Sequence, residues 1–254
     1  MKIAIVIPVM APEVAKDWEY VVYCLNRTLR AILNNNAVDQ RIYVACQSRP
    51  TAMLSDDRIV FVKSEHPIPD SNDGAAKRQD KGAKTQLAFQ RAAEFKPDYI
   101  MQVDADDMVS RHLFDYLVSS PGYDAYCVNC GYEWWEGRRS MTIRHHFHKC
   151  CGSTFIAKYN ADLFPFWVGN QPPPVPPRVC DNPHTHIEDA LLAGGFKVHY
   201  LNKPMVVYLS GGSDHLREKG NKVLLKRRVK DWALAFWRNR KLNKSLRDEF
   251  AIQE

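Results

Sequence analysis

A short apolar segment that ends in a cluster of acids constrains this chain more than any other part of its sequence. Residues 99–103 predict a buried strand, and Asp104-Ala105-Asp106-Asp107 follow it directly. Ligands of open α/β sheets bind outside the carboxyl ends of the strands. Three neighbouring carboxylates repel one another unless a cation neutralises them, and Mg²⁺ usually binds together with substrate phosphates. The segment therefore predicts a site for a divalent metal and a diphosphate. The alternative is a set of solvated loop acids.

Predicted strands and helices alternate along the rest of the chain. Apolar runs predict strands at residues 3–9, 41–46, 58–63, 124–132, 153–156, 196–201 and 205–209. Apolar stripes predict helices at residues 18–34, 82–95, 187–193 and 221–240. The polar residues 64–80 and the proline-rich residues 165–184 predict loops. This alternation is typical of βαβ units in a mostly parallel sheet.

Composition favours a globular protein with a sizeable core. Of 254 residues, 45% are hydrophobic and 25% are charged, which is ordinary for a folded domain. No run approaches the roughly eighteen apolar residues of a membrane span. Residues 1–8 are too short, and end in a proline, to form a signal peptide. We therefore expect a cytoplasmic protein, either free or peripheral at the cytoplasmic face of a membrane.

The net charge of +6 is concentrated near the end of the sequence. Residues 216–254 contain twelve Lys or Arg and five Asp or Glu, so the remainder of the chain is close to neutral. A near-neutral body argues against a nucleic-acid-binding protein. The tail predicts a basic amphipathic helix whose apolar face packs on the domain. The alternative is that the helix contacts an anionic membrane surface and brings the protein to a lipid-linked acceptor.

Seven cysteines suggest a second, non-enzymatic interpretation. Cys127 and Cys130 have the spacing of one half of a zinc knuckle, and the neighbouring Cys150 and Cys151 are its nearest complement. A zinc-stabilised binding module without catalysis is therefore one alternative. Reduced, buried thiols are the other interpretation.

Four elements, in order, carry a resemblance to a known family. They are the opening strand that ends at Pro8, the Asp104-x-Asp106 motif, the Glu188-Asp189 pair followed by Gly194-Gly195, and the strand 204–208 that leads to His215. Over residues 1–215 the chain resembles GT-A-fold glycosyltransferases, in layout the inverting family-2-like enzymes. The resemblance implies one α/β, Rossmann-like GT-A domain with a mixed, mostly parallel central sheet flanked by helices.

The resemblance also implies a division of the chain. Residues 1–110 would form the nucleotide-binding half, residues 111–215 the acceptor-binding half, and residues 216–254 a C-terminal helical tail. The implied reaction moves a sugar from a nucleotide-sugar donor to a hydroxyl of a glycan or lipid-linked saccharide. Inversion at the anomeric carbon is the expected outcome.

Roles for individual residues follow from the same resemblance. Asp104, Asp106 and His215 would bind Mn²⁺ or Mg²⁺, which stabilises a departing nucleoside diphosphate as a Lewis acid. Asp189 would be the general base, with Glu188 as the second choice. The residues that would contact the nucleotide sugar are Pro8, Gln47, Asp80, Lys84 and Asp104.

One departure from the family pattern concerns the nucleobase. The family usually carries an aspartate pair after the second strand, whereas this strand is followed by Gln47. The base is therefore undetermined, with uridine as the default. An Asp-x-Asp motif after a strand also occurs in haloacid-dehalogenase-type phosphatases, where it lies near the N-terminus. Nucleotidyltransferases share the architecture, but their glycine-rich, arginine-bearing loop is missing after Val9.

Overall fold

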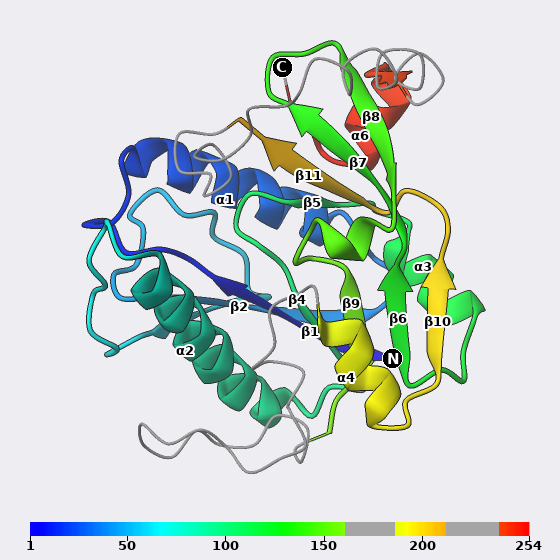
Figure 1. The fold of residues 1–254 in the computed structure, drawn as a ribbon, viewed down its shortest axis with the longest axis horizontal. Coiled ribbons are helices and arrows are strands. Elements are labelled where there is room, and N and C mark those ends of the chain that lie inside the picture. Colours follow the sequence, from blue (N-terminus) through cyan, green and yellow to red (C-terminus); the bar gives the residue numbers. More distant parts are fainter. Residues whose placement is uncertain (161–185, 212–238, 254) are drawn as a thin grey trace.

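Strand β1 (Lys2–Pro8) lies at the centre of the fold because its side chains, apart from Lys2, are buried on both faces. The computed structural model describes residues 1–160, 186–211 and 239–253. A strand without a polar face requires cover on both sides. Figure 1 shows α1 (Trp18–Leu33) and α2 (Gly74–Ala92) on opposite faces of the sheet. The α1 side packs on Ile3, Ile5 and Ile7, and the α2 side packs on Ala4 and Val6.

The first sheet has seven strands in the order β10-β6-β9-β4-β1-β2-β3. Strands β2 (Asp39–Cys46) and β4 (Tyr99–Gln102) are parallel to β1, and β3 (Ile59–Lys63) is parallel to β2. Strand β9 (Phe155–Lys158) runs antiparallel between β4 and β6 (Ala125–Val128). Strand β10 (Val198–Leu201) is parallel to β6. The mixed, mostly parallel sheet flanked by helices that the sequence predicts is confirmed.

A second sheet has five strands in the order β12-β8-β7-β11-β5. Its members are β5 (Met108–Val109), β7 (Cys130–Trp135), β8 (Ser140–His145), β11 (Val206–Ser210) and β12 (Asn239–Lys241). The single strand predicted at residues 124–132 is wrong in this respect. Asn129 separates β6 from β7, and the chain passes there from the first sheet to the second. Both strands are apolar, so the sequence pattern did not reveal the break.

Helix α1 is buried on most sides because it lies between the two sheets. Leu25, Leu29 and Ile32 share a core with β1 and β2. Cys24 and Ala31 pack with residues of β7, β8 and β11. The helix begins after Asp17, whose side chain accepts a hydrogen bond from the Tyr20 backbone N–H.

Helix α2 begins earlier than the sequence pattern predicts. Its first residue is Gly74, because the Asp73 carboxylate accepts hydrogen bonds from the backbone N–H groups of Ala75 and Ala76. The loop predicted at residues 64–80 is therefore wrong for its last part. Residues 74–80 are in the helix, which places Asp80 and Lys84 one turn apart on one face.

Shorter helices complete the described chain. They are η1 (Ala93–Phe95), α3 (Leu113–Ser119), η2 (Phe147–Lys149), α4 (Ile187–Ala193) and α6 (Lys244–Glu249). Of the ranges described, no helix combines the length and apolar character needed to cross a bilayer.

The end of the chain belongs to the second sheet. Strand β12 pairs antiparallel with β8, and Phe250 and Ile252 are buried in the core that contains Tyr132. The proline-rich residues 165–184 and all but the last two residues of the predicted tail helix lie outside the described residues. Those last two, Asn239 and Arg240, are in β12.

Candidate functional site

The three acids of the Asp104–Asp107 loop lie where the chain crosses between the sheets. The backbone N–H of Val103 still bonds to Val6 beside β1, and β5 begins at Met108. The loop therefore lies at the carboxyl end of β4, as the sequence predicts. Asp104 and Asp106 are partly exposed, whereas Asp107 is completely buried.

Asp107 holds the loop from the inside. Its Oδ2 accepts hydrogen bonds from the Ser153 hydroxyl at 2.6 Å and the Cys151 thiol at 3.1 Å. Burial, followed by repulsion from Asp106 and Asp104, raises the pKa of Asp107 well above its ordinary value. Asp107 is thus neither a solvated acid nor an accessible ligand.

Three further contacts fix the backbone of the loop. Ser153 Oγ accepts a hydrogen bond from the Asp104 N–H at 2.8 Å, and the Thr28 hydroxyl of α1 donates to the Ala105 carbonyl at 3.0 Å. A Cβ atom on Gly152 would lie 3.0 Å from Asp104 Oδ2, so the glycine permits this close approach. Residues from two separate parts of the sequence, Thr28 and Gly152–Ser153, therefore hold the loop. Serine, threonine and glycine at these positions carry no motif, which is why sequence reasoning missed them.

Lys81 of α2 forms an ion pair with the acid loop. Its Nζ lies 2.7 Å from Asp104 Oδ1, and the Lys81 side chain is 46% exposed. Burial lowers the Lys81 pKa, but attraction to Asp104, Asp106 and Asp107 outweighs it, so the pKa is raised. Lys81 is not among the site residues that the sequence predicts, although Asp80 and Lys84, which lie beside it on α2, are.

Lys84 and Asp80 form a buried network under the α2 side of the site. Lys84 Nζ lies 2.6 Å from Asp80 Oδ2, with side-chain exposures of 1% and 5%. Gln47 donates from Nε2 to Asp80 Oδ1 at 2.9 Å and to the His66 carbonyl at 3.3 Å. The structure therefore brings together three of the residues predicted to contact the nucleotide. In it, Lys84 neutralises Asp80.

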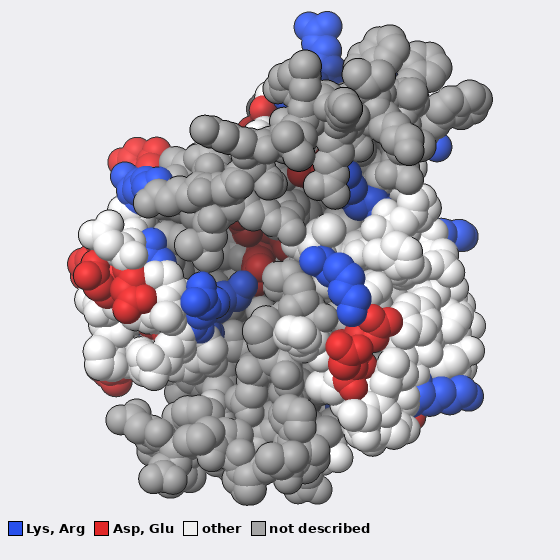
Figure 2. Space-filling model, in the orientation of Figure 1, with Lys and Arg blue, Asp and Glu red and all other residues white. Residues whose placement is uncertain are grey.

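Pro8, Gln47 and Asp104 stand at the carboxyl ends of three neighbouring parallel strands. Pro8 ends β1, Gln47 follows β2, and Asp104 lies just after β4. Figure 2 shows acidic side chains inside a hollow on this face, with basic side chains on either side of it. An anionic ligand with a cation fits such an alternation of charge.

Glu188 and Asp189, the predicted catalytic pair, have different surroundings at the start of α4. Glu188 Oε2 lies 2.8 Å from Lys149 Nζ and 3.0 Å from His148 Nε2, and Tyr200 donates to its Oε1 at 2.8 Å. The hydrogen bond from Lys149 leads the contacts that lower the pKa of Glu188. The Asp189 side chain is 71% exposed, with His186 Nδ1 at 3.9 Å.

The donor set at the acid loop fits a hard divalent ion only in part. Two partly exposed carboxylates are suitable oxygen ligands, and Asp104 already attracts a cationic side chain. His215, the predicted third ligand, lies outside the described residues. Within the described ranges, no group of three or more His, Cys, Asp or Glu side chains gathers as a metal site.

The cysteines are not assembled into the zinc site of the alternative interpretation. Cys127 and Cys151 belong to different apolar cores, and Cys151 bonds to Asp107. Cys130 is buried in β7 and Cys150 is partly exposed. All four are free thiols, and burial raises the pKa of the Cys127 and Cys130 thiols.

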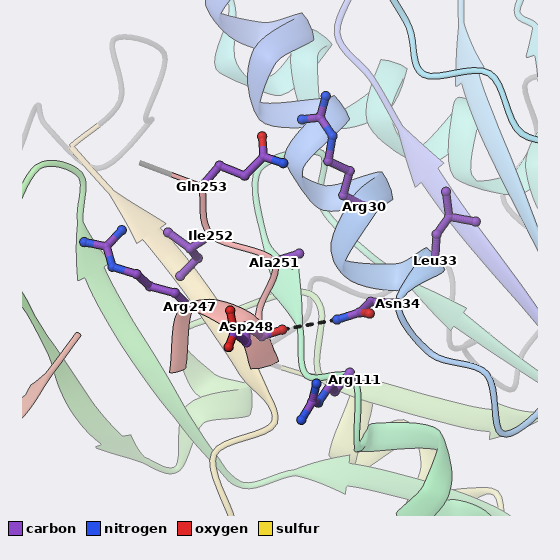
Figure 3. A pocket seen from close by; sticks show the side chains of 9 residues that line it. All are labelled: Arg30, Leu33, Asn34, Arg111, Arg247, Asp248, Ala251, Ile252 and Gln253. Atoms are coloured by element: carbon purple, nitrogen blue, oxygen red, sulfur yellow. Dashed lines mark hydrogen bonds between the residues drawn. The ribbon is translucent and has the colours of Figure 1, made fainter. Parts of the chain in front are cut away.

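A separate cavity of about 570 Å³ lies between α1 and the C-terminal turn. Arg30, Arg111 and Arg247 line it, but Figure 3 shows their guanidinium groups pointing in different directions. The Asn34 side chain donates to the Asp248 carbonyl at 3.2 Å across it. Because its polar groups do not converge on one point, this cavity is a weaker candidate for a ligand site than the acid loop.

Comparison with solved structures shows the fold. A structure of S. aureus TarS residues 1–349 in complex with UDP-GlcNAc superposes with a TM-score of 0.51 at 9% identity, over 87% of this chain and 62% of that chain. The chain thus spans less than two thirds of the TarS fragment. At this identity the likeness shows the fold alone, and the chain has the predicted GT-A-like fold of nucleotide-diphospho-sugar transferases.

Two more distant structures match over most of this chain. Francisella tularensis 2-C-methyl-D-erythritol 4-phosphate cytidylyltransferase has a TM-score of 0.45 and 13% identity, over 92% of this chain and 99% of that one. The catalytic domain of Drosophila β1,4-galactosyltransferase 7, in complex with xylobiose, has a TM-score of 0.41 and 12% identity, over 89% and 78%. No protein-family model and no curated protein sequence matches the chain.

We expect Ser153→Ala to lower the free energy of unfolding by about 1–3 kcal/mol, because it removes the bond partner of two buried groups. Those groups are the Asp104 N–H and the Asp107 carboxyl. Urea denaturation measures the loss. Ser245→Ala, at an exposed position of α6, is the matched control and should change stability by less than about 0.5 kcal/mol. Equal stability of both variants would exclude the bridging role of Ser153.

Glu188→Gln should destabilise the protein more at pH 7 than at pH 3. The folded-state pKa of Glu188 is lowered, so its ion pairs stabilise the fold above the ordinary pKa of about 4.5. This contribution disappears as the pH falls through the lowered folded-state pKa. We expect about 1 kcal/mol at pH 7, because Lys149 is 42% exposed and its pairing is screened. Urea denaturation at both pH values, with the exposed Glu94→Gln as control, measures this difference. A loss that is the same at pH 3 would contradict it.

Proposed function

We propose that this protein is a metal-dependent glycosyltransferase that transfers a sugar from a nucleoside-diphosphate donor to a hydroxyl acceptor. The observation that carries the proposal is the rigidly held acid loop at the carboxyl end of β4. There, Asp104 and Asp106 remain partly exposed while Asp107 is buried as an anchor. The fold supports the same class of reaction.

Asp104 and Asp106 would hold the divalent metal, with His215 as a proposed third ligand. Mn²⁺ or Mg²⁺, when bound, supplies Lewis-acid stabilisation of the charge on a departing diphosphate. The protein's own contribution is to keep the two carboxylates in place. Contacts from Ser153 and Thr28 hold the backbone on either side of Ala105 before any ligand binds.

The nucleotide would lie over the ends of β1, β2 and β4, beside Pro8, Gln47 and Asp104. The amide of Gln47 already binds Asp80, and Lys84 neutralises the same carboxylate, so these two buried residues hold the Gln47 side chain in place. A neutral amide recognises a base by hydrogen bonds rather than by charge. Uridine is the first base to test, since the TarS structure holds UDP-GlcNAc.

Asp189 is the proposed general base and would accept the proton of the acceptor hydroxyl as that oxygen attacks the anomeric carbon. Of the predicted pair, Asp189 has the exposed carboxylate, whereas Glu188 is held by Lys149, His148 and Tyr200. Glu188 would position the start of α4. An exposed base on the face opposite the leaving group is the arrangement that inversion requires.

A saccharide or a lipid-linked saccharide is the proposed acceptor. Contact of the basic tail with an anionic membrane, and a cytoplasmic location, stay predictions. Residues 212–238 lie outside the described part of the chain, so the membrane-binding face of the tail is not defined. The described residues 239–253 pack on the second sheet.

Asp106→Ala should abolish metal-dependent transfer, with a loss of at least about 100-fold in kcat/KM, because a charge-stabilising group is removed. A screen of melting temperatures against nucleoside diphosphates with Mn²⁺ first identifies the nucleotide. Transfer is then measured as release of that nucleoside diphosphate. Asp39→Asn, at the opposite end of the sheet, is the control and should retain full activity. Undiminished transfer by Asp106→Ala, or release of pyrophosphate in its place, would exclude this function.

Asp189→Asn should lower kcat by about 100-fold or more while KM for the donor changes little, since a general base acts in the chemical step. The wild-type pH profile of kcat should show one acidic limb that the variant lacks. Glu188→Gln, the neighbouring carboxylate, should retain that limb. Loss of the limb in Glu188→Gln alone would assign the base to Glu188.

A further inference from the structure

Two lysines on α2 are bonded to carboxylates at the site, and their environments differ. Lys84 and Asp80 are buried to 1% and 5% exposure, and this pair lies inside the domain. Lys81 and Asp104 are 46% and 23% exposed, so this pair is reached by solvent. Exposed ion pairs contribute little to stability, whereas a buried partner cannot be removed without leaving an unpaired charge. Lys84 is thus structural, and Lys81 is free to exchange its partner.

Lys81 is paired with the Asp104 carboxylate, which is also a proposed ligand of the metal ion. Its Nζ lies 2.7 Å from Asp104 Oδ1, at hydrogen-bonding distance. A divalent ion that binds Asp104 must therefore displace this ammonium group or share the carboxylate with it. A lysine has a flexible four-carbon stem and a compact charge, so its ammonium can move while its backbone stays in the helix.

A nucleoside diphosphate provides the alternative partner for that ammonium group. Its phosphate oxygens are strong acceptors for a lysine, and they reach the site together with the metal. Lys81 is on α2 and Asp104 follows β4, so the two charges of the pair come from different elements. A metal ion bound together with a diphosphate would neutralise Asp104 through the metal and Lys81 through the phosphate oxygens.

We propose that Lys81 is an exchangeable counter-ion of this site. It neutralises Asp104 when no donor is bound and moves to the diphosphate of the donor when the metal takes its place. This inference rests on the proposed function, because it requires a metal and a nucleoside diphosphate as ligands. Its consequence is that metal alone binds weakly, and that metal and nucleotide strengthen each other's binding.

The Lys81→Met variant tests this role. If Lys81 is an exchangeable counter-ion, the affinity for Mn²⁺ alone should rise and the affinity for the nucleoside diphosphate should fall. Isothermal titration with Mn²⁺ alone should show binding at least about fivefold tighter in the variant, since the competing cation is gone. Titration with the nucleoside diphosphate at saturating Mn²⁺ should show binding at least about tenfold weaker, since a phosphate partner is gone. Lys81→Arg keeps the charge and should retain most of the nucleotide affinity.

Lys158→Met is the matched control. Lys158 and Asp124 form a comparable pair, with Nζ and Oδ1 2.8 Å apart and exposures of 48% and 36%. In the sheet, Lys158 of β9 lies opposite Tyr99, which is at the other end of β4 from Asp104. The affinities of the Lys158→Met variant for Mn²⁺ and for the nucleoside diphosphate should therefore not change. Lys81→Gln repeats the test if methionine at this exposed position reduces the yield of folded protein.

The outcomes distinguish this inference from the function on which it rests. Wild-type protein that binds neither Mn²⁺ nor any nucleoside diphosphate overturns the proposed function and the role of Lys81 together. Wild-type protein that binds both, with a Lys81→Met variant in which the two affinities fall together or stay unchanged, overturns the role of Lys81 alone.

Discussion

Repulsion among three carboxylates in one four-residue loop is the constraint around which this site is built. The repulsion is relieved in a different way at Asp107 and at Asp104. Asp107 is withdrawn into the core and bonded to Ser153 and Cys151, and Asp104 is neutralised by Lys81. Asp106 remains partly exposed. Under the proposed function, an acidic loop held in this way would receive a cation without rearranging its backbone.

Helix α1 connects this loop to the rest of the fold. Because α1 lies between the two sheets, one helix shares a core with β1 on one side and with β7 and β11 on the other. Thr28 of that helix bonds the Ala105 carbonyl at the point where the chain leaves the first sheet for the second. The end of the chain adds β12 to the second sheet, and Phe250 packs in the core that this sheet shares with α1.

Neighbouring residues of the same chemical type have different surroundings, and the proposed function gives them different tasks. On α2, the buried Lys84 balances Asp80, and the exposed Lys81 faces the acids. On α4, Glu188 is held by three partners, and Asp189 is exposed. In each case burial decides the task, because a buried charge must keep its partner and an exposed one can exchange it.

The sequence by itself determined the local elements and the position of the acid loop. The apolar β1, the amphipathic α1 and the strand before Asp104 are recognisable because their side-chain periodicity is local. Only the tertiary structure decided that Asn129 divides one apolar run between two sheets, and that the sheet places Ser153 beside Asp104 across 49 positions of sequence. It also decided which lysine of α2 faces the acids, because the polar cap at Asp73 extended the helix over residues that looked like a loop. Strand pairing and side-chain direction depend on contacts between distant segments, and residue spacing alone does not encode them.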